Sequence, residues 1–507
     1  MADVFQHPNA RIVLTIAALN ALDTTGLSSD DAVYVLGYYA EGDEGGGLFR
    51  WSPAAAAADD GGMVIRPTVG AAATGNGRWL RVYESKTANV LHFGAKNDNT
   101  GDQQAAVDAA SLWVTQGFTG AAINTTMAGT VYFPPGTYRF TTAPLARAYV
   151  KFVGASMDAT TLHWASTGIF LDANANTAGI GIRFALADIC LFGSSSTFEL
   201  FRLRSVFSCK NTRVSFKGTH GPPASGKAGQ QLGQTGVFLH TDGTGDNTFE
   251  SCRFYDLGVG VLAGDIGNQI TDCHFAYCYY AVSGDLAAGN PSTDMVNCTL
   301  NADTTPSPIY SQCAVYFPRT ANRIHLVECY IEGWPTCVQL GNPANTADGG
   351  PYGAGFINCK IGPGSGGTGL LIAAAKQTTI INCIFAAAAG DPSPITFPAG
   401  HAAPEGICIQ PVFSYAWSGL EGTDMPSSHF PSRWVYLGRI QNKLSDDGVY
   451  IGGYPNGVKV VSGTVSSPEG SKTAPRGSLY LSSAGTMYLK ATGATSKPWD
   501  NTGWVQK

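Results

Sequence analysis

The chain has 507 residues, of which 44% are apolar, so it is long enough to bury either a large core or a long repetitive one. Charged residues make up only 13%, and the formal net charge is −6 without a long basic run, which argues against a nucleic-acid partner that needs many phosphate contacts. The 63 glycines favour a turn-rich β protein, for which we expect a neutral or weakly charged ligand.

The N-terminal segment is expected to begin with an amphipathic helix. Residues 12–22 read IVLTIAALNAL, which is too short to span a membrane and lacks a small-residue cleavage site, so a signal peptide is not expected. Glycine-rich and aromatic segments follow, among them VYVLGYYAEGDEGGGLFRW. No run of 18 apolar residues occurs anywhere in the chain, so we expect no membrane span.

A second helix is expected over about residues 102–116, with Asp102 as its N-cap. It lies between VLHFGAKN (90–97) and the strand segment GTVYFPPGTYRF (129–140). A helix placed here would cover the open edge of a first β coil. Its expected apolar face consists of Ala105, Ala109, Leu112 and Trp113.

A repeat is centred on cysteines. Seven segments share the form x-x-x-Cys-x-(Phe/Leu/Ile), and from Cys252 onward their cysteines recur every 21 to 31 residues. The seven are Cys190, Cys252, Cys273, Cys298, Cys329, Cys359 and Cys383. With a second apolar segment in each repeat, this period predicts a solenoid of stacked coils, a parallel β-helix, in which the cysteines form an inward column that serves packing. No CxxC, HxxxH or HExxH motif occurs, so we expect no metal site and no cofactor.

The residue before each cysteine predicts a bend, because the alternation of apolar residues fails there. Asparagine holds this position in several repeats, and asparagine tolerates left-handed backbone and can hydrogen-bond its counterpart in the next coil. The pattern therefore predicts an asparagine ladder along one edge. Asp272 and Glu328 replace asparagine in that ladder.

The entry segments at 90–114 and 129–140 resemble those of pectate-lyase-like right-handed β-helices, notably phage tailspikes and polysaccharide depolymerases. The first 85 and the last 30 residues resemble the end modules of phage tail proteins. The resemblance implies an all-β fold, namely a right-handed parallel β-helix with a small N-terminal β module, a helical cap and a small C-terminal β domain, assembled as a homotrimer. The expected boundaries are 1–85 for an attachment module, 86–430 for the β-helix and 431–507 for a trimerisation or receptor-contact domain.

Four acids are candidates for glycan cleavage. Asp272 and Glu328 occupy equivalent positions two coils apart, near the upper end of the roughly 6.5–9.5 Å that separates the carboxyl groups of inverting glycosidases. Glu332 lies past the strand beside Trp334, and Asp303 lies one coil below it. Each could instead be a solvated or capping carboxylate, and Asp272 and Glu328 could be simple members of the ladder.

Several neighbouring side chains could bind a sugar, because aromatic rings stack on its apolar C–H face and cations or imidazoles hydrogen-bond its carboxylates. The candidates are Trp334, Tyr330, His274, Arg253 and Tyr310. Two alternatives stay open: Trp334 could cover the core at the turn before Pro335, and His274 could be an ordinary exposed strand residue.

The resemblance implies a virion tailspike, assembled in the host cytoplasm, that acts at the bacterial cell surface. Its β-helix would bind and cleave a surface polysaccharide, either capsule or lipopolysaccharide O-antigen, and its N-terminal module would attach to a tail or baseplate protein. Hydrolysis is favoured over a lyase reaction because the central coils lack an arginine cluster to stabilise an enolate. The alternatives are a non-catalytic adhesin and, disfavoured by the tail-like termini and the absent signal peptide, a secreted pectinase-like enzyme.

Overall fold

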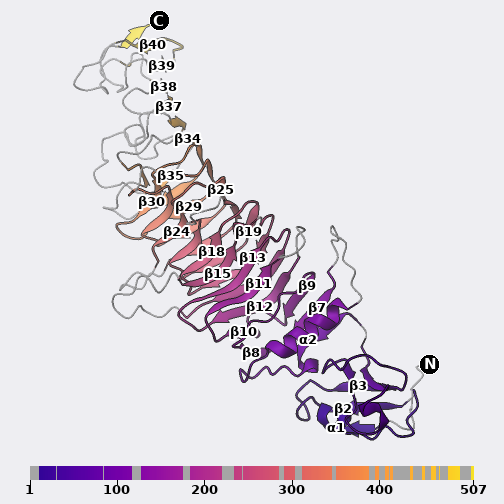
Figure 1. Ribbon diagram of the computed structural model, residues 1–507. Helices are drawn as coiled ribbons and strands as arrows, with labels where there is room; N and C mark the ends of the chain where they lie inside the picture. Colours follow the sequence, from indigo (N-terminus) through magenta and orange to yellow (C-terminus); the bar gives the residue numbers. More distant parts are fainter. Residues whose placement is uncertain are drawn as a thin grey trace. The chain divides into compact units, whose positions relative to one another are not determined.

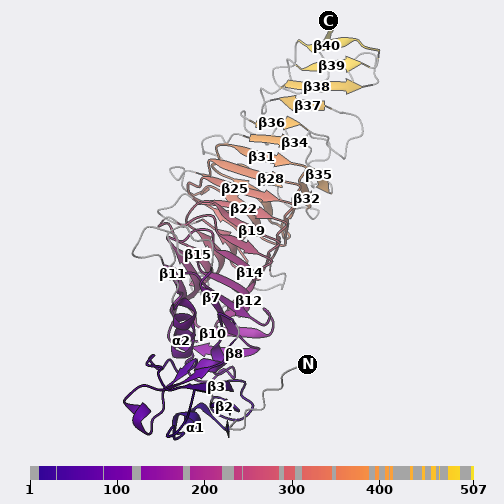
Figure 2. The ribbon, with the colours of Figure 1, turned by 90° about the vertical axis from the view of Figure 1, so that its right-hand side faces the viewer.

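The computed structural model divides the chain into two compact units, Met1–Thr219 and His220–Lys507, and each is described by itself. Figure 1 and Figure 2 show the order of the elements in two views. The described residues are 11–29, 31–83, 85–116, 127–174, 183–219, 233–242, 244–284, 291–302, 311–344, 350–386, 394–398, 406–409, 412–414, 434–437, 448–451, 458–463, 468, 478–482, 484–491 and 504–507.

The first unit begins with a five-stranded sheet in the order β1-β2-β3-β5-β4. Its strands are β1 (Arg11–Val13), β2 (Ala32–Val35), β3 (Gly47–Ser52), β4 (Val64–Ile65) and β5 (Arg78–Arg81). The first pair is parallel and the other pairs are antiparallel. Trp51 and Trp79 pack in its core with ring centroids 5.1 Å apart, so aromatic side chains supply much of the apolar area that this small module buries.

The helix expected over residues 12–22 is wrong in its first part. Arg11–Val13 forms β1 because it pairs with β2, which gives its backbone groups hydrogen-bond partners. Helix α1 (Ile16–Asn20) begins only after Thr15, whose hydroxyl accepts the Ala18 N–H at 3.1 Å. The apolar run is therefore divided between a strand and one short amphipathic helix.

The expected capping helix is confirmed as α2 (Gln104–Thr115), which contacts β6 (Thr87–Asn89) and β7 (Gly129–Phe133). The N-cap residue is Gln103, not Asp102. Asp102 still accepts the Gln104 N–H at 3.2 Å, and its second oxygen accepts the Thr141 hydroxyl at 2.8 Å. The acid therefore ties the start of the helix to the chain that follows β8 (Gly136–Phe140).

The apolar face expected for α2 is wrong in part. Trp113 is buried as expected, but Leu112 is 48% exposed and Ala105 faces solvent. The buried stripe instead follows Val107, Ala110 and Val114, whose spacing of three and four residues fits one helical face. The two valines offer more apolar surface than the alanines, so this face packs against the strands.

Parallel strands continue the first unit. The pairs β8–β10, β9–β12, β10–β12, β12–β14 and β11–β13 are all parallel. The strands are β9 (Val150–Gly154), β10 (Thr160–Trp164), β11 (Gly168–Asn174), β12 (Ala185–Gly193), β13 (Phe198–Arg204) and β14 (Lys210–Lys217). Neighbours in these pairs come from different coils, as expected of a solenoid that stacks one coil on the last.

The second unit repeats a coil of three strands, and each strand pairs in parallel with its counterpart in the next coil, so the predicted parallel β-helix is confirmed (Figure 2). The first strand of each coil is β16 (Thr248–Glu250), β19 (Asn268–Thr271), β22 (Ser292–Val296), β25 (Arg323–Val327), β28 (Gly353–Ile357), β31 (Thr378–Ile381) or β34 (Gly406–Ile409). The second is β17 (Arg253–Tyr255), β20 (His274–Ala276), β23 (Thr299–Asn301), β26 (Tyr330–Glu332), β29 (Lys360–Gly362), β32 (Ile384–Ala386) or β35 (Val412–Ser414). The third, starting with the coil of β16 and β17, is β18 (Val259–Ala263), β21 (Tyr280–Ser283), β24 (Cys313–Phe317), β27 (Thr336–Leu340), β30 (Thr368–Ile372) or β33 (Ile395–Thr396). Strand β15 (Gln234–Leu239) is the corresponding strand of the coil before β16.

The predicted inward cysteine column is present from Cys252 to Cys383, and all twelve cysteines of the chain are free and buried. The placement of Cys190 in this column is wrong by one residue. Ile189 pairs in register with Val214, which occupies the cysteine position of its own coil, and Cys190 pairs with Ser215 on the other face of the strand. A shift of one residue turns every side chain of a strand to the opposite face.

The predicted bend is also present. Ser251, Asp272, Asn297, Glu328, Asn358 and Asn382 all have φ between 51° and 56°. Each bend separates the first strand of a coil from its second strand. The bend N–H groups are satisfied by the next coil; for example, the Glu328 N–H donates to the Ile357 carbonyl at 2.9 Å. This explains why a position with left-handed backbone recurs with the cysteine period.

Beyond β34 the strand pairing is no longer uniformly parallel, and parallel and antiparallel pairs both occur. Strand β36 (Trp434–Leu437) is parallel to β34 but antiparallel to β37 (Gly448–Ile451). The remaining strands are β38 (Val458–Gly463), β39 (Leu479–Ser482), β40 (Met487–Lys490) and β41 (Trp504–Gln506). In the described part of the chain, no helix is long and apolar enough to cross a membrane.

Candidate functional site

The outward side chains of the second strands form a polar face that we call the β17–β29 face. In each of these three-residue strands the central residue points to the core and its two neighbours point outward. The parallel register sorts the outward residues into two rows. One row is Arg253, His274, Thr299, Tyr330 and Lys360, and the other is Tyr255, Ala276, Asn301, Glu332 and Gly362.

Glu332 is exposed at the end of β26 and belongs to a chain of three polar groups. The Tyr330 hydroxyl donates a hydrogen bond to the Glu332 carboxylate. The Lys360 ammonium lies 3.4 Å from that hydroxyl and 4.6 Å from the centroid of the Tyr330 ring. The bond to Glu332 raises the pKa of Tyr330, so the phenol keeps its proton near neutral pH and holds the carboxylate in a fixed orientation.

His274 lies two coils from Glu332 and has a polar contact at each ring nitrogen. Its Nδ1 lies 2.7 Å from the Tyr255 hydroxyl, and its Nε2 lies 3.5 Å from the Asn301 side-chain nitrogen. Burial lowers the pKa of His274, and the positive charge of Arg253 lowers it further. The imidazole is therefore neutral near pH 7 and can exchange hydrogen bonds with sugar hydroxyls.

The structure places Asp272 and Glu328 on the bend row, two coils apart with Asn297 between them, and all three side chains are exposed. At about 4.8 Å per coil, their backbones are about 10 Å apart. The Asn297 side chain donates to Asp272 Oδ1 at 2.7 Å. Asp272 therefore takes part in the predicted ladder.

Trp334 requires a correction. It was expected to offer its ring to a sugar, but it is 0% exposed and its indole N–H donates to the Leu300 carbonyl at 3.1 Å. The ring covers the core at the turn after β26, as the alternative interpretation held, because an indole buries a large apolar area while satisfying its one donor. Asp303 and Tyr310 lie outside the described residues.

A second polar group on the first strands was missed at the sequence level. Arg323 and Asp294 form an ion pair at 2.5 Å, and His325 Nδ1 lies 3.5 Å from the other oxygen of Asp294. Asp294 and His325 share a register position in β22 and β25. The available signal was the two-residue alternation of STDMV and RIHLV, which turns these side chains outward.

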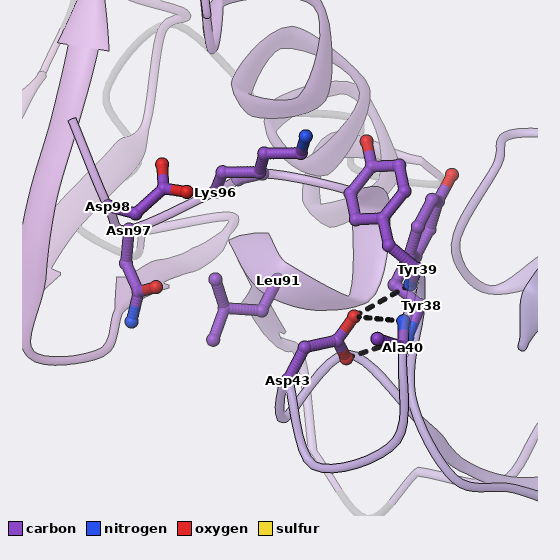
Figure 3. A pocket seen from close by; sticks show the side chains of 9 residues that line it. Tyr38, Tyr39, Ala40, Asp43, Leu91, Lys96, Asn97 and Asp98 are labelled. Atoms are coloured by element: carbon purple, nitrogen blue, oxygen red, sulfur yellow. Dashed lines mark hydrogen bonds between the residues drawn. The ribbon is translucent and has the colours of Figure 1, made fainter. Parts of the chain in front are cut away.

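No group of three or more His, Cys, Asp or Glu side chains within the described ranges is arranged to hold a metal ion. A separate pocket of about 200 Å³ lies in the first unit and is lined by Tyr38, Tyr39, Ala40, Asp43, Leu91, Ala95, Lys96, Asn97 and Asp98 (Figure 3). Asp43 accepts four backbone N–H groups of its own loop, and the Lys96 ammonium lies 4.7 Å from the centroid of the Tyr39 ring. Asp43 and Lys96 are therefore engaged in contacts within the loops that line the pocket. The pocket contains none of the predicted site residues.

Two family models match parts of the sequence. "Phage tail protein small four-stranded beta-sheet domain" matches residues 12–84. This range covers the N-terminal sheet, which has five strands here, one more than the family description gives. "Rhamnogalacturonase A/epimerase, pectate lyase-like" matches residues 87–221, which include β6, the capping helix and the strands as far as β14. The two matches confirm that the entry segments resemble pectate-lyase-like β-helices and that the N-terminal module resembles a phage tail protein domain. No curated protein sequence matches the chain.

Solved tailspike structures share the fold at low sequence identity. The enzymatically active domain of tailspike protein 2 of bacteriophage CBA120 matches with a TM-score of 0.52 and 13% identity over 83% of this chain. The match spans 56% of that tailspike domain, so this chain corresponds to little more than half of its length. The tailspike gp49 of Acinetobacter baumannii bacteriophage Fri1, a capsular polysaccharide depolymerase, matches with a TM-score of 0.46 and 15% identity over 80% of this chain and 66% of that one. The tailspike of Acinetobacter phage vB_ApiP_P1 matches with a TM-score of 0.48 and 15% identity over 96% and 86%.

Proposed function

We propose that the protein is a phage tailspike that binds a bacterial surface polysaccharide on the β17–β29 face and hydrolyses it. The observation that supports this most is the exposed Glu332, oriented by Tyr330 and Lys360, on a face that also carries His274 and Asn301. The tail-domain and pectate-lyase-like matches and the tailspike fold fit this role.

In this proposal Glu332 acts as the base of a glycoside hydrolase. Its carboxylate removes a proton from water, which attacks the anomeric carbon while a second carboxylic acid protonates the leaving glycosidic oxygen. The hydrogen bond from Tyr330 restricts the carboxylate before substrate arrives, so less orientation entropy is lost in the transition state.

The second carboxyl group is assigned to Glu328, with Asp303 as the other candidate from the sequence. Glu328 is exposed at a bend whose backbone is fixed by its bond to the next coil. Asp272 also stays a candidate, but its hydrogen bond from Asn297 favours a ladder role. Arg253, His274 and Tyr330 would bind sugar hydroxyls or carboxylates on the same face.

A binding-only adhesin is the second candidate function, because an open row of polar side chains can hold a glycan without cleaving it. The test incubates the full chain with capsular and O-antigen polysaccharides of a host panel. New reducing ends without absorbance at 235 nm indicate hydrolysis, whereas an unsaturated product absorbing at 235 nm indicates a lyase. Retention of intact glycan with neither signal would support the adhesin and overturn the enzyme.

The proposal includes a homotrimer in a virion tail, attached to a tail or baseplate protein through the N-terminal module and assembled in the host cytoplasm. A row that we call the β-branched stripe supports self-association. Val296, Val327, Ile357, Ile381 and Ile409 occupy one outward register position in five consecutive coils, and Val296 is 36% exposed. Isolated outward Val or Ile residues are common, but an aligned apolar row on a protein surface often marks a protein interface.

A further inference from the structure

A serine, a histidine and an asparagine from three separate parts of the chain meet on the outer surface of the first unit. His163 lies on β10, Ser194 follows β12, and Asn99 precedes the capping helix. The Ser194 hydroxyl lies 2.8 Å from His163 Nε2, and the Asn99 side-chain oxygen lies 2.8 Å from His163 Nδ1. His163 and Ser194 lie between β8 and β13, Asn99 lies before α2, and all three are outside the β17–β29 face.

This arrangement has the geometry of a nucleophile, its base and the group that orients the base. The Asn99 amide oxygen can only accept a hydrogen bond, so the 2.8 Å contact requires the donor proton on His163 Nδ1 and leaves the Nε2 lone pair directed at Ser194. The serine hydroxyl can then donate to Nε2 at 2.8 Å, which is a better bond than its 3.5 Å contact with the Trp164 carbonyl. Catalytic triads are recognised by this geometry and these roles, on any fold.

The neighbouring side chains keep the imidazole in position and neutral. The Phe192 ring lies against it, with centroids 5.0 Å apart and planes 32° apart. Burial lowers the pKa of His163, and the positive charge of Arg139, its register partner on β8, lowers it further. A neutral imidazole is the form that can accept the serine proton. Ser194 itself is exposed, so a substrate can reach it.

We propose that Ser194, His163 and Asn99 form a second catalytic site, which hydrolyses carboxylic esters, specifically acyl groups on sugar hydroxyls. The sugar part of this assignment rests on the proposed glycan-binding function, whereas the ester chemistry rests on the three side chains alone. Substituted polysaccharides present such esters on the same polymer that the β17–β29 face would bind.

The reaction has two balanced halves. Ser194 Oγ bonds to the acyl carbon while its proton moves to His163 Nε2, and the ester C–O bond then breaks as the imidazolium returns that proton to the leaving alcohol oxygen. Water next gives a proton to His163 and attacks the acyl-serine, which releases the carboxylic acid and restores the serine hydroxyl. The sum is ester plus water to alcohol plus acid.

The site differs from a fast serine hydrolase in one respect. The Ser194 backbone N–H is bonded to the Trp164 carbonyl at 3.1 Å, so it is not available to stabilise an oxyanion. Arg139 is the cation on the adjacent strand, and it makes no side-chain hydrogen bond or ion pair with any described residue. Because one oxyanion donor is worth roughly 10²–10³ in rate, we expect turnover well below that of dedicated esterases.

The test measures hydrolysis of p-nitrophenyl acetate by the full chain, which needs no glycan. We expect Ser194→Ala to lower kcat/KM by roughly 10²-fold, the usual contribution of an activated nucleophile and its base. Ser196→Ala changes an exposed serine of the same loop and should leave the rate within about twofold. A fluorophosphonate probe should label Ser194, as found by mass spectrometry, and His163→Ala should abolish the labelling.

Asn99→Asp gives a second, positive readout. Asn99 has φ 64°, which aspartate also tolerates, so the substitution preserves the backbone. A carboxylate stabilises the imidazolium better than an amide does, so we expect kcat/KM to rise by about tenfold or more. An unchanged rate in Ser194→Ala would overturn the second site, and no gain in Asn99→Asp would overturn the role of Asn99. Neither result bears on glycan cleavage, so the two proposals fail independently.

Discussion

Asn297 donates its side-chain amide to Asp272 at 2.7 Å, across the step from one coil to the next. The contact joins two bend residues that share left-handed backbone, with φ of 52° and 54°. It shows that a carboxylate can replace asparagine as an acceptor in the ladder. The same contact separates two acids that the sequence alone treats as equivalent, because Asp272 is engaged by Asn297 through a bond that has no counterpart among the described contacts of Glu328.

This difference predicts opposite outcomes at the bend. Asp272→Asn should retain glycan cleavage within about threefold, because an amide oxygen can accept the same hydrogen bond at a cost near 1 kcal/mol or less. Glu328→Gln should lower cleavage by roughly 10²-fold if it supplies the acid. Reducing-end assays at equal protein concentration check both, with thermal unfolding as a folding control. Loss of activity in Asp272→Asn at an unchanged Tm would move the catalytic role to Asp272.

Glu332→Gln is expected to reduce glycan cleavage by about 10²–10⁴-fold while binding persists, because the amide cannot remove a proton from water. Tyr330→Phe removes only the orienting hydrogen bond, so a smaller loss of about tenfold is expected. Glu250→Gln is the matched control, since Glu250 is a half-exposed carboxylate on β16 outside the β17–β29 face. Full activity in Glu332→Gln would exclude this residue as the base.

Trp334 is expected to act on stability and not on sugar binding. Trp334→Ala should lower the free energy of unfolding by about 3–5 kcal/mol, because it removes a fully buried indole. Trp334→Phe keeps an aromatic ring but loses the bond to the Leu300 carbonyl, so a loss of about 1–3 kcal/mol is expected. Denaturant unfolding measures the change, and glycan affinity measured where both variants are folded should stay within about twofold. A selective loss of affinity would restore the sugar-stacking role.

His92 predicts a pH dependence of stability in the first unit. Burial, helped by the charge of Arg81, lowers the pKa of His92 to about 3, against roughly 6.5 in the unfolded chain. Between these values the unfolded state binds the extra proton, so stability falls as the pH drops below 6.5, by about 2 kcal/mol at pH 5. The loss continues down to the folded pKa. His92→Gln should remove this part of the pH dependence in unfolding experiments at pH 7 and pH 5, and an unchanged slope would refute it.

The β-branched stripe predicts that a charge in its centre disrupts assembly. Ile357→Asp should convert the proposed trimer to monomer, since an interface closing over the stripe would bury an unpaired carboxylate. Gln269→Asp is the control, because Gln269 is exposed on β19 and lies outside the stripe. Light scattering after size exclusion reports the mass. A monomeric unsubstituted chain, or a trimer that survives Ile357→Asp, would contradict the proposed interface.

Much of the fold could be predicted from local periodicity. The cysteine spacing predicts the coils, and the failed alternation before each cysteine predicts the bend that the φ values of Asn358 and Asn382 display. Cys190 shows the limit of this reasoning. Its segment has the same sequence pattern as the other repeats, but the strand register is shifted by one residue, so the side chain points to the opposite face. The helix α2 shows another limit, because two adjacent faces have helical spacing and only packing against β6 and β7 selects one.

The candidate site could be predicted less completely. Glu332 was expected just past its strand and is the last residue of β26, and its exposure agrees with the expectation, but Trp334, two residues later, turns into the core. Exposure at a turn depends on where the chain goes next, and single-sequence patterns do not contain that information. The ion pair of Arg323 with Asp294 and the contacts of His274 with Tyr255 and Asn301 join different coils, so they depend on register.

The sequence by itself determined the repeat, the inward cysteine column and the bend, because these follow from the order of apolar and polar residues within one coil. The tertiary structure alone decided which surface side chains of neighbouring coils meet. It places Asn99, His163 and Ser194 together although 64 and 31 residues separate His163 from its two partners. Loops of different length between the strands of a solenoid erase any fixed spacing between surface residues, while parallel pairing sets their distance at about 4.8 Å per coil. Chemistry between coils therefore becomes visible only once the register is known.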